Sequence, residues 1–460
     1  MNVLSRLMEP KLSLPEGQRR FSNQELLQLI VPIVMEQLLV LLVGIADTLM
    51  VSYAGDAAVS GVSLVNQLNN VFILVLGAIA SGGAVVASQY VGRRDQEHGA
   101  ASSSQLLMIG TVISILMAAG VILLRVPLLN ALFGRAEEDV LDASMTYLLI
   151  SALSFPSMAI YNSTSALLRS MNRTRSVMNV SIVMNLTNVA GNAIGVFALH
   201  AGVAGVAVPS LISRIFAAVI LLVLCLNRNQ PLYIRWPDVF SWEGPMLRRI
   251  LSIAAPNGIE NGLFNLSKVA LSSILTTFGT VQIAANGVAQ NFWSLAALFS
   301  IAFGYAFVTV VGQCVGAGDI PAADYYIKKL LRMTYLGSFL WNAVIMVLTP
   351  LVLKFYNLSQ ETIHLIIILV AIHNLFNSLL CPLSLSLSNG LRAAGDAAYT
   401  MFAAIFASVV CRIFLSMVFG VWMDMGVIGL SIAMVLDWLI KAVLIAARYH
   451  SRKWTKFQVI

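Results

Sequence analysis

Carboxylates inside apolar segments are the first residues of this chain with the chemistry to hold a cation. Glu36 and Asp47 lie in one long apolar run, Glu260 lies in a later run, and Asp437 lies in the last. An ionisable side chain at the centre of a bilayer costs about 2.5–3.5 kcal/mol on insertion scales. A bound proton or Na⁺ removes that charge, and a ligand that binds two conformations differently shifts their populations. These four carboxylates are the predicted cation-coupling residues.

The two carboxylates of the first apolar run share one helix face. Eleven residues separate Glu36 from Asp47, which on an α-helix amounts to about 20° of rotation and about 16 Å along the axis. We expect both to face one cavity. The alternatives are a position close to the cytoplasmic interface for Glu36 and a position at the extracellular end of the helix for Asp47.

Amide side chains and one lysine accompany these carboxylates. Around Glu260 the polar residues occupy an arc of about 140° of a helix, and such a stripe does not face lipid. A water-filled cleft and plain interhelical contacts are the two interpretations of the stripe, and amides can either coordinate a cation or bond to each other. The predicted cavity-lining residues are Asn66, Gln67, Asn188, Asn192, Asn261, Asn265, Lys268, Gln290 and Asn291.

Other charged residues in the last apolar runs have a more structural interpretation. Arg412, Asp437 and Lys441 are expected to form a salt-bridge cluster, although Asp437 also stays a coupling candidate. His373 is a weaker candidate for a proton relay, because a lone histidine is more often packed and hydrogen-bonded.

The elements that position these residues are membrane helices. The chain has 460 residues, of which 58% are hydrophobic and 11% charged, whereas globular proteins have roughly 25% charged residues. Most of its surface must therefore face lipid. Since a helix needs about 20 apolar residues to cross the hydrocarbon core, we predict twelve spans: 24–50, 60–91, 103–125, 140–169, 176–198, 204–226, 247–277, 283–315, 327–353, 362–392, 397–422 and 426–448.

Basic residues predict the orientation of these spans, because cytoplasmic loops are enriched in Lys and Arg. The opposite side offers little beyond Arg125, Arg135 and Lys354. With an even number of spans both termini are expected in the cytoplasm, and the chain is expected to be a multi-pass protein of the plasma (inner) membrane. The basic side holds Arg6, Lys11, Arg19, Arg20, Arg93, Arg94, Arg169, Arg173, Arg175, Arg228, Arg235, Arg248, Arg249, Lys328, Lys329, Arg392, Arg448, Arg452, Lys453 and Lys456.

The chain also repeats itself. A shift of 224 positions places Pro32 on Pro256, Glu36 on Glu260, and the segment 89–92 on 313–316. Six spans per repeat is an even number, so both repeats run in the same direction, and a pseudo-two-fold axis is expected along the membrane normal. The predicted fold class is an all-α integral membrane protein with twelve transmembrane helices in two pseudo-symmetric six-helix lobes.

The repeat also predicts the domain boundaries. They are a cytoplasmic N-terminal segment (1–23), an N-lobe (24–226), a cytoplasmic linker (227–246), a C-lobe (247–448) and a cytoplasmic tail (449–460).

Enzyme signatures are absent from the sequence. It contains no HExxH, no GxSxG and no glycine-rich phosphate loop followed by Lys-Ser/Thr. We therefore expect neither catalytic residues nor a metal or cofactor, and transport that draws on a gradient of H⁺ or Na⁺. The expected partners are a small-molecule substrate and the lipid bilayer. Despite the net charge of +7, no nucleic acid is expected, because the basic residues form no stripe, and the functional unit is expected to be a monomer.

Several short motifs resemble the multidrug and toxic compound extrusion (MATE) family over the whole chain. They are Gly44-Ile45-Ala46-Asp47-Thr48-Leu49-Met50-Val51 followed by Gly55, Gln89-Tyr90-Val91-Gly92 before a charged loop, Leu168-Arg169, and Gly390-Leu391-Arg392-Ala393-Ala394-Gly395-Asp396. The resemblance implies two lobes around a V-shaped cavity. It also implies efflux of organic cations or other drug-like compounds in exchange for protons or sodium.

The resemblance extends to single residues, with two departures. Asp47 matches the helix 1 aspartate of the family, and Glu260 matches the glutamate used by its sodium-coupled members. In the family, an asparagine is followed four positions later by an acid. Here Asn188 matches the asparagine, but the amide Asn192 replaces the acid. The sodium-coupled members also have an acid in helix 10, whereas the interior of 362–392 has none. Asp47 alone, or Glu260 with Asp437, is left to bind the ion. The alternative function is a flippase for a lipid-linked or anionic substrate of the same superfamily. Acids close to the membrane bases Lys268, Arg412 and Lys441 argue against it, and Lys268 keeps it open.

Overall fold

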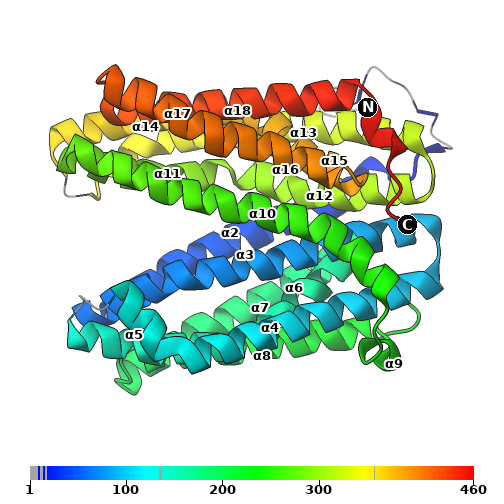
Figure 1. Cartoon of the computed structure of the whole chain (residues 1–460), viewed down its shortest axis with the longest axis horizontal. Helices are drawn as coiled ribbons and strands as arrows, with labels where there is room; N and C mark the ends of the chain where they lie inside the picture. Colours follow the sequence, from blue (N-terminus) through cyan, green and yellow to red (C-terminus); the bar gives the residue numbers. More distant parts are fainter. Residues whose placement is uncertain (1–8, 11–13, 16–17, 134–136, 357) are drawn as a thin grey trace. The chain divides into compact units, whose positions relative to one another are not determined.

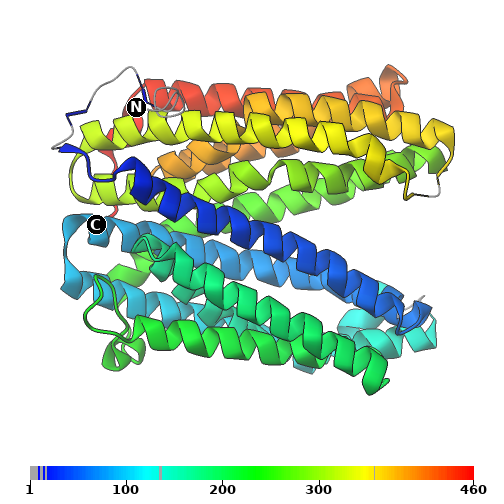
Figure 2. The same cartoon turned by 180° about the vertical axis from the view of Figure 1, so that it is seen from behind.

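The computed structural model describes residues 9–10, 14–15, 18–133, 137–356 and 358–460. Throughout these ranges the chain forms helices and connecting loops without a β-strand, and Figures 1 and 2 show the helices of each half running roughly along one direction. The helices of the first half are α2 (Asn23–Ser52), α3 (Asp56–Arg93), α4 (Gln96–Phe133), α5 (Glu138–Leu153), α6 (Phe155–Ser170), α7 (Thr174–Ala193), the π-helical η2 (Ile194–Ala198) and α8 (Ala204–Cys225).

The second half has a longer series of helices, several of which continue into π-helical turns. They are α10 (Gly244–Leu275), the 3₁₀ turn η3 (Thr276–Phe278), α11 (Thr280–Ala296), α12 (Leu298–Gly316), α13 (Ile320–Leu353), α14 (Gln360–Cys381), η4 (Pro382–Leu387), α15 (Ser388–Ala393), α16 (Ala397–Ile405), η5 (Phe406–Cys411), α17 (Arg412–Ser416), η6 (Met417–Trp422) and α18 (Gly426–His450). The short α9 (Trp236–Val239) lies in the linker, and η7 (Lys453–Lys456) follows α18.

The twelve predicted spans are confirmed as twelve helical segments. Within the described residues, ten helices are long and apolar enough to cross a membrane, and the bent pair α5–α6 makes eleven. The pair bends by 43°, at a break followed by Pro156, which has no N–H for the helix ladder. The twelfth segment is α10, which is less apolar because its sequence carries Glu260, Lys268 and several asparagines.

The internal repeat is visible in the backbone geometry. Positive φ angles recur at the shift that relates the two halves of the sequence, at Gly55 (105°) and Gly279 (90°) and at Gly202 (57°) and Gly426 (55°). The same shift joins two non-glycine residues, His200 (46°) and Asp424 (55°). Because residues with a side chain seldom adopt these angles, the agreement shows that each half repeats the same turns.

One stretch of the second half is out of register by a single residue. Asn172 and Gly395 both have positive φ, but the separation between them is one position shorter than the repeat shift. His200 and Asp424 are again separated by the full repeat shift. The π-helical turn η5 lies between Gly395 and Asp424 and has no counterpart between Asn172 and His200. A π-turn takes up one extra residue within a helix, so η5 restores the register.

Two backbones approach closely where η2 meets α8, and the second half has an equivalent close approach. A Cβ atom on Gly195 would lie 2.1 Å from the carbonyl oxygen of Gly205, and one on Gly205 would lie 2.7 Å from Gly195. The equivalent Gly429 approaches the Phe419 carbonyl in the same way, at 2.6 Å. Only glycine allows this contact between η2 and α8.

We therefore expect Gly205→Val to destabilise the protein by about 3 kcal/mol through overpacking. The measurement is the thermal unfolding midpoint of the purified protein. Gly120→Val is the matched control, because a Cβ atom on Gly120 meets nothing within 4 Å. Equal midpoints for the two variants would contradict the close contact.

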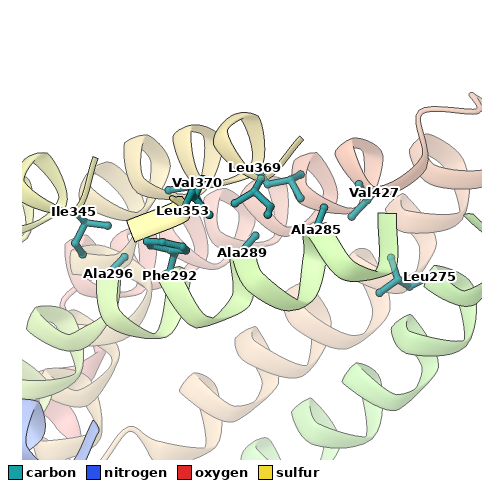
Figure 3. Packing of buried hydrophobic residues seen from close by; sticks show 11 residues of the cluster. Leu275, Ala285, Ala289, Phe292, Ala296, Ile345, Leu353, Leu369, Val370 and Val427 are labelled. Atoms are coloured by element: carbon teal, nitrogen blue, oxygen red, sulfur yellow. The ribbon is translucent and has the colours of Figure 1, made fainter. Parts of the chain in front are cut away.

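The second half contains an apolar cluster in which small residues of α11 meet α13 and α14 (Figure 3). Ala285, Ala289 and Ala296 of α11 are buried against Leu369 and neighbouring side chains. Alanines at this spacing lie on one helix face, and their small size lets the neighbouring helices pack closely. The cluster holds the helices on which the cavity residues of this half are placed.

The helices divide into two compact units. One comprises Leu27–Gly258, and the other comprises Ile259–Ile460 together with the N-terminal residues up to Leu26. The dividing points fall inside α2 and α10. The lobe and linker boundaries derived from the sequence stay predictions, and Arg6, Lys11 and Arg135 of the basic pattern lie outside the described residues.

The predicted linker packs against the first unit. Gln105 on α4 donates its Nε2 hydrogens to the carbonyl oxygens of Asp238 (2.7 Å) and Ser241 (2.8 Å).

In the second unit, the buried Lys329 Nζ binds Glu9 Oε1 at 2.8 Å, so this lysine is an ion-pair partner rather than a free loop charge.

Candidate ion-coupling and cavity residues

Asp47 is joined to α7 and α8 by a chain of polar side chains. Asn192 donates to Asp47 Oδ1 (2.7 Å) and to Asn188 Oδ1 (3.3 Å), and Asn188 donates to Ser210 Oγ (2.7 Å). Asp47 is half-buried, whereas both asparagines are buried. The two asparagines predicted from the sequence thus lie beside the aspartate, although α2 and α7 are far apart along the chain. We call these four residues the Asp47 network.

A cation near this network was not predicted from the sequence. Arg214 on α8 donates to Ser154 Oγ at 2.8 Å and interacts electrostatically with Asp47 and Tyr147. The signal was available, because an arginine in the middle of the apolar segment 204–226 is as unusual as Lys268 or Arg412.

Glu36 belongs to a different cluster from Asp47, although both lie on α2. Its Oε1 forms an ion pair with Arg169 Nη2 at 2.6 Å and accepts a hydrogen bond from the Tyr161 hydroxyl at 3.4 Å. Only 3% of Glu36 is exposed. The expected common cavity of Glu36 and Asp47 stays a prediction, but their partners are separate.

Glu260 forms the same contact in the other half and adds a second cation. Arg392 Nη2 lies 2.7 Å from Glu260 Oε2, and Lys441 Nζ lies 3.1 Å from Oε1. Arg169 and Arg392, which the charge pattern placed among loop charges, are instead largely buried ion-pair partners. Each repeat therefore contains one Glu–Arg pair built from its first and fourth spans.

Asp437 is fully buried and is paired with one of the two bases that the sequence suggested. Its Oδ1 accepts a hydrogen bond from Ser408 Oγ at 2.8 Å, and its Oδ2 lies 3.6 Å from Arg412 Nη1. The expected cluster of Arg412, Asp437 and Lys441 thus forms in part, because Lys441 pairs with Glu260. His373 is buried and hydrogen-bonded to Ser431 Oγ at 3.1 Å, as expected for a packed histidine.

A cavity of about 310 Å³ lies within the second unit. Among the predicted lining residues it brings together Lys268, Gln290 and Asn291. The other predicted residues of α10, Asn261 and Asn265, are joined along the helix by a hydrogen bond of 2.8 Å from Asn265 Nδ2 to the Asn261 carbonyl oxygen.

In the first unit, the positions equivalent to Gln290 and Asn291 are exposed. Asn66 Oδ1 accepts a weak bond of 3.4 Å from the Tyr147 hydroxyl, and Gln67 is exposed on the same helix. The structure thus gives the position of every predicted coupling and cavity-lining residue. The roles assigned to these residues from the sequence stay predictions.

The chain is similar to known membrane transporters over nearly its whole length. It is 28% identical to the uncharacterized transporter YisQ of Bacillus subtilis, covering 92% of this chain and 93% of YisQ. It is 25% identical to the probable multidrug resistance protein NorM of Thermotoga maritima, covering 98% of this chain and 96% of that protein.

A solved structure shares the fold. The outward-facing conformation of a multidrug resistance MATE family transporter of the MOP superfamily matches with a TM-score of 0.85, at 18% identity, over 94% of this chain and 96% of that chain. At this identity the likeness concerns the fold alone.

The family model of MatE matches the chain twice, over residues 32–194 and 256–418. The starts and the ends of the two matches are related by the same shift as the halves of the sequence, so the matches reproduce the repeat found in the sequence and in the backbone angles. Together they cover well over half of the chain. The chain therefore belongs to the MatE family, the multidrug and toxic compound extrusion family of multi-pass membrane transporters.

Proposed function

We propose that this transporter exports organic cations or other drug-like compounds in antiport with H⁺ or Na⁺. The observation that carries the proposal is the state of Asp47. Among the described residues Glu36, Glu260 and Asp437 each form an ion pair with an arginine or lysine, whereas Asp47 forms none within 4 Å. A half-buried carboxylate without a salt bridge is the one best suited to bind a transported cation.

The surroundings of Asp47 support an exchangeable cation. Oxygen atoms are the preferred ligands of hard cations, and Asn192 Oδ1 is buried without a hydrogen-bond partner, on the side chain that donates to Asp47. A proton or Na⁺ at Asp47 neutralises the charge and lowers the cost of closing the site to water on one side. A cationic substrate competes for the same charge and leaves as the ion enters, and only such differential binding shifts the two conformations.

The proposal includes the orientation and the assembly of the protein. Both termini lie in the cytoplasm of the plasma (inner) membrane, as the basic loops favour. The monomer is the functional unit, the small-molecule substrate and the lipid bilayer are its partners, and the transported H⁺ or Na⁺ takes the place of a cofactor. Transport without an enzymatic step fits the family.

The test is uptake of a fluorescent organic cation into inverted membrane vesicles with an imposed proton or sodium gradient in turn. We expect one gradient to drive uptake and its dissipation by an ionophore to stop it. Uptake that ignores both gradients would contradict antiport.

The alternative of a flippase for a lipid-linked or anionic substrate is supported by one observation. Lys268, in the cavity of the second unit, has no carboxylate partner within 4 Å among the described residues.

A further inference from the structure

In the internal repeat, the cavity of the second unit is equivalent to the Asp47 network of the first unit. Its wall contains Leu271, Arg412, Ser416 and Met434. These residues follow Asp47, Asn188, Asn192 and Ser210 by 224 positions each. The same framework thus presents an aspartate with two asparagines in one half, and a leucine with an arginine and a serine in the other.

The charge of the cavity wall is positive. Lys268 and Arg412 belong to the wall, and none of its described lining residues is an aspartate or glutamate. The Lys268 ammonium lies 4.8 Å from the centre of the Phe264 ring, and the Arg412 guanidinium lies 5.9 Å from the same ring. Behind the wall, Asp437 is the carboxylate that faces Arg412, at 3.6 Å.

The surroundings do not balance this charge. Glu260 is already shared between Arg392 and Lys441. Four cations (Lys268, Arg392, Arg412 and Lys441) therefore face two carboxylates (Glu260 and Asp437), which leaves two positive charges in excess. In a membrane protein such charges are paired or mark the path of a substrate.

Hydrogen-bond donors in the wall also lack acceptors. Arg412 Nε, Trp293 Nε1 and Ser416 Oγ are buried without a hydrogen-bond partner, and all three residues line the cavity. Buried donors are normally satisfied. A group with several acceptor oxygens would supply the missing negative charge and the missing acceptors together.

The rest of the wall is partly apolar and partly polar. Its apolar side chains are Leu271, Leu275, Leu430 and Met434, and its neutral polar side chains include Asn286, Gln290 and Asn291. A cavity of about 310 Å³ is at the lower end of the range for drug-sized ligands, roughly 300–1,000 Å³. The cavity therefore suits a small amphipathic molecule with one anionic group.

We propose that this cavity is an anion subsite, in which Lys268 and Arg412 bind the carboxylate, sulfonate or phosphate of an amphipathic organic anion or zwitterion. The Asp47 network then binds a cation and this cavity binds an anion, at equivalent positions of the repeat. The proposal goes beyond ion-driven cation efflux, because it concerns binding in the second unit and requires no gradient.

The test uses two probes of the same shape, naphthalene-2-carboxylate and naphthalene-2-carboxamide. Binding of each to the full-length protein in phosphatidylcholine nanodiscs is measured by isothermal titration calorimetry. We expect the carboxylate to bind about tenfold or more tightly than the amide, and Lys268→Gln to remove most of this preference, since a hydrogen bond to a charged group has that strength. Lys354→Gln, at the end of α13 and outside the cavity wall, is the matched control and should leave the preference unchanged.

A second variant tests Arg412 without leaving a carboxylate unpaired. Asp437→Asn removes the competing negative charge behind Arg412 and should tighten binding of naphthalene-2-carboxylate. A thermal midpoint for each variant separates loss of binding from loss of folding. Equal affinity of the two probes for the wild-type protein, or an unchanged preference in Lys268→Gln, overturns the proposal.

The source of the anion is decided by repeating the titration in phosphatidylglycerol nanodiscs. If phosphatidylglycerol weakens carboxylate binding to the wild-type protein more than it weakens binding to Lys268→Gln, the subsite is assigned to a lipid phosphate. Unchanged binding assigns it to a soluble anion. Asp47→Asn should not alter carboxylate binding. Failure of cation efflux and failure of the anion subsite are thus separate results.

Discussion

Asp47→Asn is expected to reduce ion-driven efflux to the background of vesicles without the protein. The substitution keeps an oxygen that accepts the hydrogen bond from Asn192, but it removes the charge that binds the coupling ion. Because the hydrogen bond survives, the free energy of unfolding should change by no more than about 1 kcal/mol. Initial rates of fluorescent-cation uptake and a thermal midpoint on the same preparation measure the two effects.

Asp56→Asn provides the matched control for this prediction. Asp56 is an exposed residue in the first turn of α3, so its substitution tests the loss of an acid at a nearby position without touching the Asp47 network. Wild-type rates in Asp47→Asn would end the assignment of coupling to this residue. Full transport by Asp47→Asn combined with Glu260→Gln would rule out both carboxylates and leave Asp437 as the candidate.

Glu260→Gln is expected to destabilise the protein by about 3–5 kcal/mol, because removing one partner of a buried ion pair leaves uncompensated charge. Here two cations lose their partner at once, since Arg392 and Lys441 both contact Glu260. In the first unit, Glu36→Gln strands only Arg169 and should cost less. The measurement is thermal unfolding of each purified variant in detergent.

A compensating variant makes this second prediction specific. Glu260→Gln combined with Lys441→Met removes one of the two stranded charges and should recover part of the lost stability. A wild-type midpoint in Glu260→Gln, together with a loss of ion-driven efflux, would instead identify Glu260 as a coupling residue. The two outcomes distinguish a structural role from a transport role.

The partners of the two membrane glutamates, Glu36 and Glu260, were beyond reach of the sequence. The spacing around Glu260 placed it correctly on a polar face of α10, but its partner Arg392 is 132 residues away and was counted as a loop charge. Arg169 is likewise 133 residues from Glu36. Such pairs depend on which helices pack together and on how far a long side chain reaches inward from a helix end, and neither is encoded in local spacing.

The spans, the repeat and the positions of the membrane carboxylates were determined by the sequence itself. Apolar length and the shift between the two halves are properties of consecutive residues, because each helix satisfies its own backbone and must be long enough to cross the lipid. Only the tertiary structure decided that Asn192 bonds to Asp47, that Arg214 lies near them, that Lys441 pairs with Glu260 rather than Asp437, and that Lys268 and Arg412 share one cavity. Helix packing brings together residues that are distant in the chain, and their charges acquire partners only once that packing exists.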